Sequence, residues 1–444
     1  VAGVTIPMGI LQSTSTQTDY VLAFWLVCFA YFGLLFKARP TLSCSLVVGL
    51  SLGLAILTKP TAYYYALPFV IWYGLAAISR LRWRVWQPAL IVLAAILMLN
   101  LPFYSRNQRL YHSFLGPFFT SIQYNIPLLN KLIQVEDNSG SAAPPPAPPA
   151  TDKAPAAVEY LPSTRGQRFA SNILKNISLH LGTPFPLINH YSGGVIVLLH
   201  DFIGIDVNAS RPVHIFSIYT MSLHEDFAGN LAHFGLLCFI IAGSVLKLSS
   251  GTWEWLKHLA ALLVGFLIFV FWVGWSPWNS RLHLALFVLS APIIGLALSR
   301  LRYDKLANAT IVALLLLSTP WVIRNASRPL VGPNNVFSRS RAEQYFANRP
   351  DMKDYHKFFA RSFTEHQCPI AGLILGADSW EYPVWVLTHA QDPSIRFYHL
   401  AVENPSATLQ AMENWPDKID CICSDKTSRC DSADGSVAFR EQEP

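Results

Sequence analysis

The stretch Tyr20–Phe36, with the sequence YVLAFWLVCFAYFGLLF, decides how the rest of the chain is interpreted. It contains no charged side chain, and Lys37 and Arg39 follow it. About 17 to 25 apolar residues in a helix can cross the hydrocarbon core of a bilayer, where every backbone amide must be satisfied within its own helix. The stretch therefore predicts a membrane-spanning helix.

Comparable apolar runs recur along the chain, at 41–58, 62–78, 89–104, 231–248, 259–275, 283–299 and 307–323. The 444 residues are 52% hydrophobic and 14% charged, whereas soluble domains carry about 25% charged residues. We therefore expect an α-helical polytopic membrane protein with about eight complete spans. The apolar opening Val1–Met8 is typical of the last turns of a helix, so we also expect a partial span and an N-terminally truncated chain.

The net charge of +6 is distributed unevenly between the turns that connect these runs. Basic residues concentrate in alternate turns, at Lys37, Arg39, Arg80, Arg82, Arg84, Lys247, Lys257, Arg300, Arg302 and Lys305. The other short turns contain only Lys59 and Arg281. By the positive-inside rule the basic turns face the cytoplasm. We therefore expect a multi-pass protein of the plasma (inner) membrane.

The domain organisation follows from shifts in composition. Residues 1–327 form the expected transmembrane domain, with a long outer region at 105–227 and a disordered Pro- and Ala-rich insertion at 138–157. Residues 328–444 predict a small extracytoplasmic α/β domain, with strands at 368–376, 395–402 and 419–424 and a helix at 380–389. In that domain we expect one or two disulfides among Cys368, Cys421, Cys423 and Cys430, the shortest loops joining Cys421 or Cys423 to Cys430.

Titratable residues gather in the turns expected on the outer side. The tripeptide His224-Glu225-Asp226 precedes an apolar run, and other outer turns contribute Asp19, Lys59, Arg106 and Arg281. Arginine forms forked hydrogen bonds to phosphate oxygens, and lysine adds a point charge. Carboxylates beside a bound lipid phosphate suit general-base catalysis of group transfer. The pattern predicts a site for a lipid-linked phosphate on the outer face.

Simpler roles compete with this interpretation. Asp19 and Asp226 could each cap the helix that follows, because Asp is a common helix cap. Lys59 and Arg281 could extend to lipid headgroups without binding a substrate. His224 could ligate a metal, although adjacent side chains rarely converge on one ion.

Several motifs resemble bacterial integral-membrane glycosyltransferases of the GT-C superfamily, in the branch of protein mannosyltransferase-like enzymes and lipid A aminoarabinose transferases. The motifs are PMGILQSTSTQTD (Pro7–Asp19), Thr58-Lys59-Pro60, Arg106-Asn107, HEDFAGN (His224–Asn230) and WNSRLH (Trp278–His283). The resemblance implies sugar transfer from a polyprenyl-phosphate donor to a lipid, glycan or protein acceptor at the extracytoplasmic side. It implies membrane lipids but no nucleic acid as partners, and it assigns no cofactor and no metal ligand, with divalent-metal dependence left open.

Family members carry a catalytic acid in the first outer loop, which this sequence does not contain. As companions or substitutes we expect Asp226, Glu225 and Asp19 in catalysis. The residues expected to bind substrate are His224, Lys59, Arg106, Asn107 and Arg281. A lipid or glycan transporter, a lipid-linked glycan polymerase or ligase, and a non-catalytic fragment are the alternatives. A transporter is less favoured, because the runs carry little mid-membrane charge and show no inverted repeat.

Overall fold

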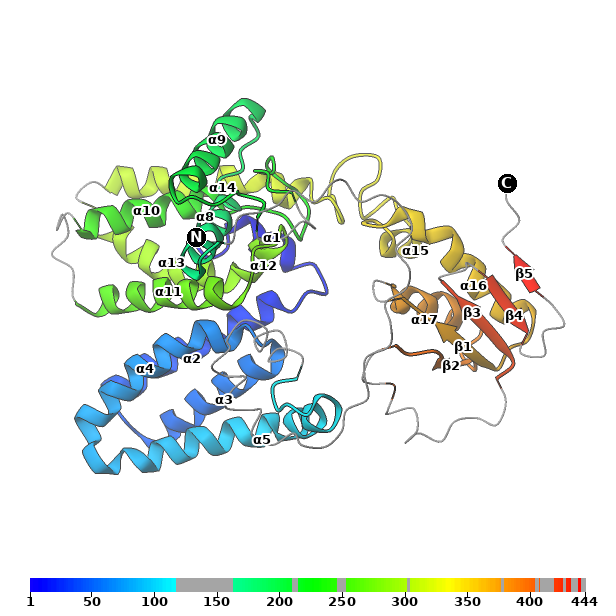
Figure 1. Ribbon diagram of the computed structural model, residues 1–444, viewed down its shortest axis with the longest axis horizontal. Helices are drawn as coiled ribbons and strands as arrows, with labels where there is room; N and C mark the ends of the chain where they lie inside the picture. Colours follow the sequence, from blue (N-terminus) through cyan, green and yellow to red (C-terminus); the bar gives the residue numbers. More distant parts are fainter. Residues whose placement is uncertain are drawn as a thin grey trace. The chain divides into compact units, whose positions relative to one another are not determined.

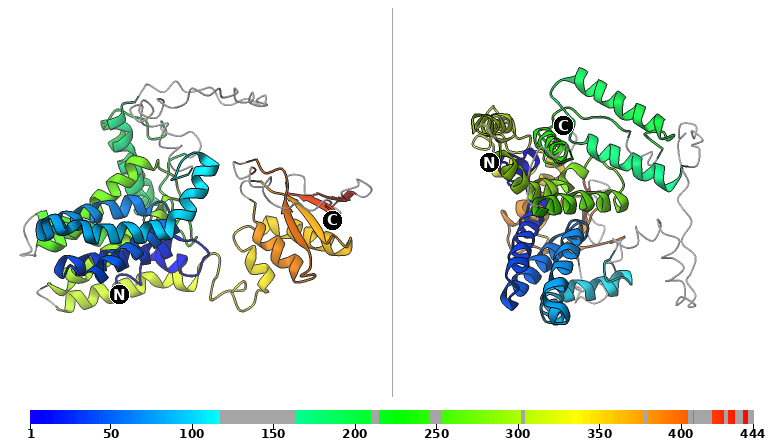
Figure 2. Two further views of the ribbon diagram at one scale, coloured as in Figure 1. Left: turned by 90° about the horizontal axis from the view of Figure 1, so that it is seen from below. Right: turned by 90° about the vertical axis from the view of Figure 1, so that its left-hand side faces the viewer.

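The computed structural model describes residues 1–116, 163–209, 215–245, 253–301, 304–376, 379–403, 407, 419–425, 429–432 and 438–440 (Figure 1). The insertion expected at 138–157 lies outside these residues. The described chain is mostly helical, and its strands lie near the C-terminus in a single sheet (Figure 2).

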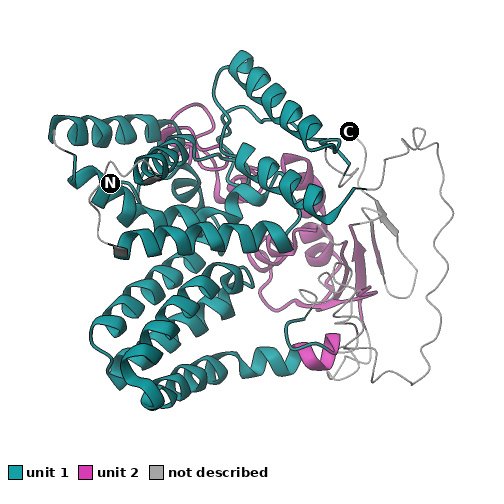
Figure 3. Ribbon diagram, turned by 60° about the vertical axis from the view of Figure 1, so that its left-hand side comes forward, with its two compact units in different colours: residues 1–106, 113–322 teal, residues 107–112, 323–444 magenta. Residues whose placement is uncertain are grey.

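The chain divides into two compact units (Figure 3). Unit 1 comprises residues 1–106 and 113–322, and unit 2 comprises residues 107–112 and 323–444. The helices that lie wholly in unit 1 are α1 (Pro7–Gln12), α2 (Asp19–Ala38), α3 (Leu42–Thr58), α4 (Ala62–Leu81), η1 (Arg82–Val85), α8 (Arg165–Ser178), α9 (Pro186–Phe202), α10 (Leu231–Val245), α11 (Trp253–Trp272), α12 (Asn279–Leu282) and α13 (Leu284–Ser299). Two further helices, α5 (Trp86–Tyr111) and α14 (Asp304–Ile323), belong mostly to it.

Four helical stretches are long and apolar enough to cross a membrane: Asp19–Ala38, Ala62–Tyr111, Glu254–Trp272 and Asp304–Ile323. The longest contains α4 and α5, and the chain reverses direction between them near Arg82, where φ is +51° (Figure 1). Shorter apolar helices cover Leu42–Thr58, Leu231–Ser244 and Leu284–Ser299. The expectation of apolar membrane helices is therefore confirmed, whereas eight complete spans remain a prediction.

Helix α2 is central to the core of unit 1 and packs against α3, α4 and α13. Its inward side chains include Leu22, Leu26 and Phe29, which are almost fully buried. At Gly33 a Cβ atom would lie 2.2 Å from the ring of Tyr73 in α4, so glycine is required for this close approach. The Tyr73 hydroxyl then reaches the carbonyl of Ala30 at 3.0 Å.

Unit 2 contains α15 (Arg341–Tyr345), η2 (Pro350–Met352), α16 (Lys353–Glu365), α17 (Glu381–His389) and the strands β1 (Ile370–Ile374), β2 (Arg396–His399), β3 (Cys421–Ser424), β4 (Arg429–Ser432) and β5 (Ala438–Arg440). The sheet order is β2-β1-β3-β4-β5, with β1 parallel to both neighbours and the last two pairs antiparallel. Helices α16 and α17 pack together on the face that carries Ala371 and Leu373.

The four cysteines of unit 2 form two disulfides, Cys368–Cys421 and Cys423–Cys430. Both lie in the buried core of this unit. Cys28, Cys44 and Cys238 are free thiols in the helices of unit 1.

Candidate functional site

The His224-Glu225-Asp226 segment forms a tight turn ahead of α10. The Ser222 hydroxyl accepts a hydrogen bond from the His224 amide at 3.1 Å, and the His224 carbonyl accepts one from the Phe227 amide at 3.1 Å. His224 Nδ1 accepts the Asp226 amide at 3.2 Å and lies 3.8 Å from Asp226 Oδ2. Because α10 begins at Leu231, Asp226 does not cap it.

Asp226 instead pairs with Arg281 of α12. Arg281 Nη1 donates to Asp226 Oδ1 at 2.7 Å, and the Ser280 hydroxyl donates to the Asp226 carbonyl at 3.1 Å. The pair is partly buried, with side-chain exposures of 26% for Arg281 and 21% for Asp226. Arg281 Nε is buried and has no hydrogen-bond partner among the described residues. The guanidinium is thus held at one nitrogen and retains an unused donor.

A second ion pair joins Asp19, the first residue of α2, to Lys59 at the end of α3. Lys59 Nζ donates to Asp19 Oδ1 at 2.6 Å, and the Asp19 side chain is only 2% exposed. Asp19 makes no capping hydrogen bond, since Thr18 occupies the N-cap position. The structure therefore pairs Lys59 with a buried carboxylate, and the capping role considered for Asp19 is wrong.

Short contacts connect the two ion pairs to common elements. Gln12 of α1 donates through Nε2 to the Glu225 carbonyl at 2.8 Å, and the Glu225 residue is buried. The Tyr65 hydroxyl of α4 donates to the Leu282 carbonyl at 2.9 Å, next to Arg281 in sequence. Helix α4, which carries Tyr65, packs against α2, which begins at Asp19. The segments that carry the two pairs are therefore neighbours within unit 1.

One expected substrate-binding residue, Arg106, makes no described contact with this group. Arg106 is exposed, and its guanidinium lies 5.4 Å from the ring centre of Phe103 in its own helix. Asn107 is buried and is grouped with unit 2. Within the described part of the chain, no hydrogen bond or ion pair links Arg106 to either ion pair.

Buried uncharged polar side chains that the sequence analysis did not select hold the site together. Asn230 Oδ1 accepts the Met8 backbone amide at 3.1 Å, and the Asn230 backbone amide donates to His180 Nδ1 at 3.4 Å. His180 Nε2 lies 3.0 Å from His283 Nδ1. Burial lowers the pKa of His180 to about 3, so its ring is neutral. Asn230 lies in the HEDFAGN motif and His283 lies in the WNSRLH motif. These motifs were therefore the sequence signal that could have identified both residues.

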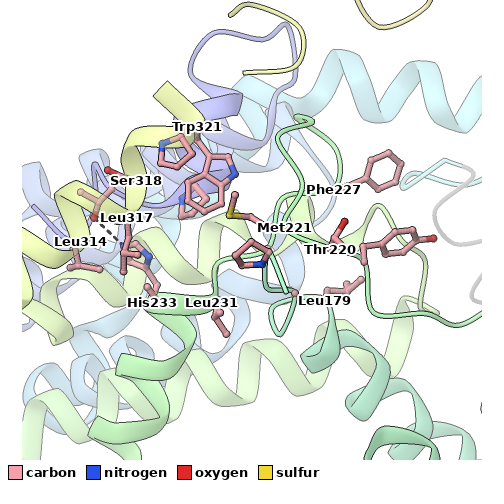
Figure 4. A pocket seen from close by; sticks show the side chains of 18 of the residues that line it. Leu179, Thr220, Met221, Phe227, Leu231, His233, Leu314, Leu317, Ser318 and Trp321 are labelled. Carbon is pink, nitrogen blue, oxygen red and sulfur yellow. Dashed lines mark hydrogen bonds between the residues drawn. The ribbon is translucent and has the colours of Figure 1, made fainter. Parts of the chain in front are cut away.

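A cavity of about 440 Å³ opens beside the turn (Figure 4). Its lining is mostly apolar and comes from Phe227 and Leu231 after the turn, Met221 before it, and Leu314 and Trp321 of α14. The Trp321 indole donates to the Ser222 carbonyl at 2.8 Å, which attaches α14 to the turn. An apolar cavity therefore adjoins the segment that holds Arg281.

Among the described residues, no three His, Cys, Asp or Glu side chains gather in a way that could hold a metal ion. His224 contacts the Asp226 amide and the Phe227 ring, and neither contact is metal ligation. No protein-family model matches the chain, and comparisons with curated proteins and with solved structures likewise find no match.

Proposed function

We propose that this chain is an integral-membrane glycosyltransferase, which transfers a sugar from a polyprenyl-phosphate donor to an acceptor on the extracytoplasmic side. The observation that carries the proposal is the Asp226–Arg281 ion pair, which is formed from a turn whose next residue, Phe227, lines an apolar cavity of about 440 Å³. A cation and an apolar cavity that share one turn fit an amphiphile with an anionic head and a hydrocarbon tail. The Arg281 side chain is 26% exposed, and its guanidinium carries five N–H donors, so donors other than the one held by Asp226 can bond to a phosphate oxygen.

The contacts of the two aspartates favour positioning roles. Asp226 orients Arg281, and Asp19 orients Lys59. In the transfer step a base takes the proton of the acceptor hydroxyl, and the hydroxyl oxygen bonds to the anomeric carbon. The bond between that carbon and the phosphate oxygen breaks, and its electron pair leaves with the phosphate. Arg281 and Lys59 stabilise the negative charge that develops there.

The proposal includes eight membrane spans, formed by α2, α3, α4, α5, α10, α11, α13 and α14. The shorter α3 and α13 both pack against the longer α2, which supports a shared orientation across the bilayer. The proposal also places unit 2 on the extracytoplasmic side of the membrane. The disulfides Cys368–Cys421 and Cys423–Cys430 support this location, because disulfides persist in oxidising compartments.

The test measures donor binding and transfer with the full chain in lipid nanodiscs. Binding of polyprenyl monophosphate is followed by thermal shift, and transfer is followed with radiolabelled polyprenyl-phosphate sugars and a membrane lipid extract. Arg281→Gln should weaken binding about tenfold to a hundredfold, the scale of a lost hydrogen bond to a charged group. The matched control is Arg349→Gln, which breaks the exposed Arg349–Asp351 pair of unit 2 and should change neither readout. Equal binding by the Arg281 variant and the unchanged chain would refute the proposal.

A further inference from the structure

In the described part of the chain, the side-chain hydrogen bonds between α9 and the rest of unit 1 lie along one side of the helix. Asn189 donates through Nδ2 to the Thr183 carbonyl at 2.8 Å and accepts the Thr183 amide at 2.8 Å. His200 Nε2 lies 3.0 Å from the Ser171 hydroxyl of α8. These contacts turn the polar side of α9 inward and fix the rotation of the helix about its axis.

The opposite side of α9 is an exposed apolar stripe, formed by Leu187, Tyr191, Val195, Leu198 and Phe202. Successive members are three or four residues apart, so they lie on one face of the helix. Their exposed fractions run from 54% at Val195 to 89% at Phe202. The stripe contains no charged residue, and α9 lies at the edge of unit 1 (Figure 1, Figure 2).

We propose that α9 lies in the membrane interface, with this stripe immersed in lipid. A spanning α9 would carry Asn189, His190, His200 and Asp201 into the hydrocarbon core, where polar and ionisable side chains are costly. Helices with an apolar face and a polar face lie in the plane of the interface with the apolar face in the acyl boundary. Unit 1 also contains helices that are long and apolar enough to cross a bilayer, so we expect lipid to surround its outer surface.

Two arginines beside α9 complement the headgroups of anionic lipids. Arg165 and Arg168 are exposed in the first turns of α8, and no ion pair with either is found in the described part of the chain. Gln167, between them in sequence, donates to the Ile203 carbonyl at 2.9 Å and so places this turn at the C-terminal end of α9. Lipid phosphate forms strong, often forked hydrogen bonds with arginine, so anionic headgroups fit these two cations beside the uncharged stripe.

Spin-label accessibility in nanodiscs of phosphatidylcholine and phosphatidylglycerol tests the proposal. Val195→Cys and Leu198→Cys are each labelled in the full chain after Cys28, Cys44 and Cys238 are replaced by Ser. His190→Cys is the matched control, because His190 is exposed on the polar flank of the same helix. Labels at 195 and 198 should collide more with oxygen, which partitions into lipid, than with a water-soluble nickel chelate, and the label at 190 should show the reverse.

Two outcomes would overturn the proposal. Preferential collision with the nickel chelate at positions 195 and 198 would place the stripe in water. Low access to both reagents, together with dipolar broadening that disappears on dilution with unlabelled chain, would show that a second copy covers the stripe. Neither outcome depends on sugar transfer, so the result is separate from the glycosyltransferase proposal.

Discussion

Arg281 uses one of its nitrogens, Nη1, to hold the Asp226 carboxylate at 2.7 Å, while its Nε donor stays buried without a partner in the described structure. A buried unpaired donor of a charged group costs stability. In the proposed complex Asp226 orients the guanidinium, which is partly exposed, and the anionic ligand bonds to the N–H groups that Asp226 does not use.

The first prediction separates this positioning role from direct catalysis by Asp226. Asp226→Asn should lower transfer at least about tenfold, because the neutral amide holds Arg281 less firmly. A double-mutant cycle with Arg281→Gln should be non-additive, the double variant being no worse than Arg281→Gln alone. Asp201→Asn, at an exposed position of α9, is the control and should keep full activity. Effects that multiply in the double variant would show that Asp226 acts independently of Arg281.

The charged part of the site could be predicted because each residue lies at the end of an apolar run. Alternation of the basic turns assigned Asp19, Lys59, Asp226 and Arg281 to one side, and in the structure they form two ion pairs. The partners themselves could not be predicted, since they depend on how α2, α3 and α12 pack. Arg106 was assigned to the same side of the membrane by the same argument, yet its described contact is with Phe103 of its own helix.

Uncharged polar contacts and α9 escaped the sequence analysis for different reasons. Asn230 and His283 lie in motifs that also contain charged residues, and the charged residues were selected first. Hydrogen bonds between residues far apart in sequence leave no local pattern. In α9, Gly193 and Gly194 interrupt the apolar spacing and lower helix propensity. In the C-terminal region the segments that become β1, α17, β2 and β3 were predicted in order, whereas β4, β5 and α16 were missed, although Phe359 and Phe363 form the buried face of α16.

The second prediction concerns the buried Asp19–Lys59 pair. Lys59→Met leaves the Asp19 carboxylate buried and uncompensated, which should cost about 3–5 kcal/mol. The double variant Asp19→Leu/Lys59→Met should recover most of this stability without recovering activity. Lys257→Met is the control, because its partner Glu254 is exposed and such pairs contribute about 0–1 kcal/mol. Thermal unfolding in detergent measures all three, and equal losses for Lys59→Met and Lys257→Met would contradict the prediction.

The third prediction compares the two disulfides of unit 2. They close loops with sequence separations of 53 and 7. On the chain-entropy account the longer loop contributes about 4 kcal/mol and the shorter about 2.4 kcal/mol. Cys368→Ser should therefore destabilise unit 2 more than Cys430→Ser, as measured by limited proteolysis of the full chain during heating. Cys28→Ser is the control, since Cys28 is a free thiol; a larger loss in Cys430→Ser would argue against loop length as the cause.

The fourth prediction is loss of stability in acid through His180. Its pKa is lowered by burial to about 3, whereas an unfolded histidine titrates near 6.5. Below about pH 6.5 the unfolded chain binds a proton that the folded chain does not, so stability is retained above this pH and falls towards pH 3 by about 1.4 kcal/mol per unit. Denaturation midpoints across this range should show a shallower slope for His180→Asn. The exposed His190→Asn should keep the original slope, and an unchanged slope in His180→Asn would exclude His180 as the source.

The last prediction fixes the orientation of unit 1 in the membrane. Thr16 is exposed just before α2, at the end that carries the Asp19–Lys59 pair, and Trp83 is 73% exposed in the turn between α4 and α5. In a background with Cys28, Cys44 and Cys238 replaced by Ser, an impermeant maleimide added to intact cells should label Thr16→Cys and leave Trp83→Cys unlabelled until the membrane is opened. The turn at Trp83 contains Arg82 and Arg84, so the opposite labelling pattern would mean that this chain departs from the positive-inside rule and that its ion pairs face the cytoplasm.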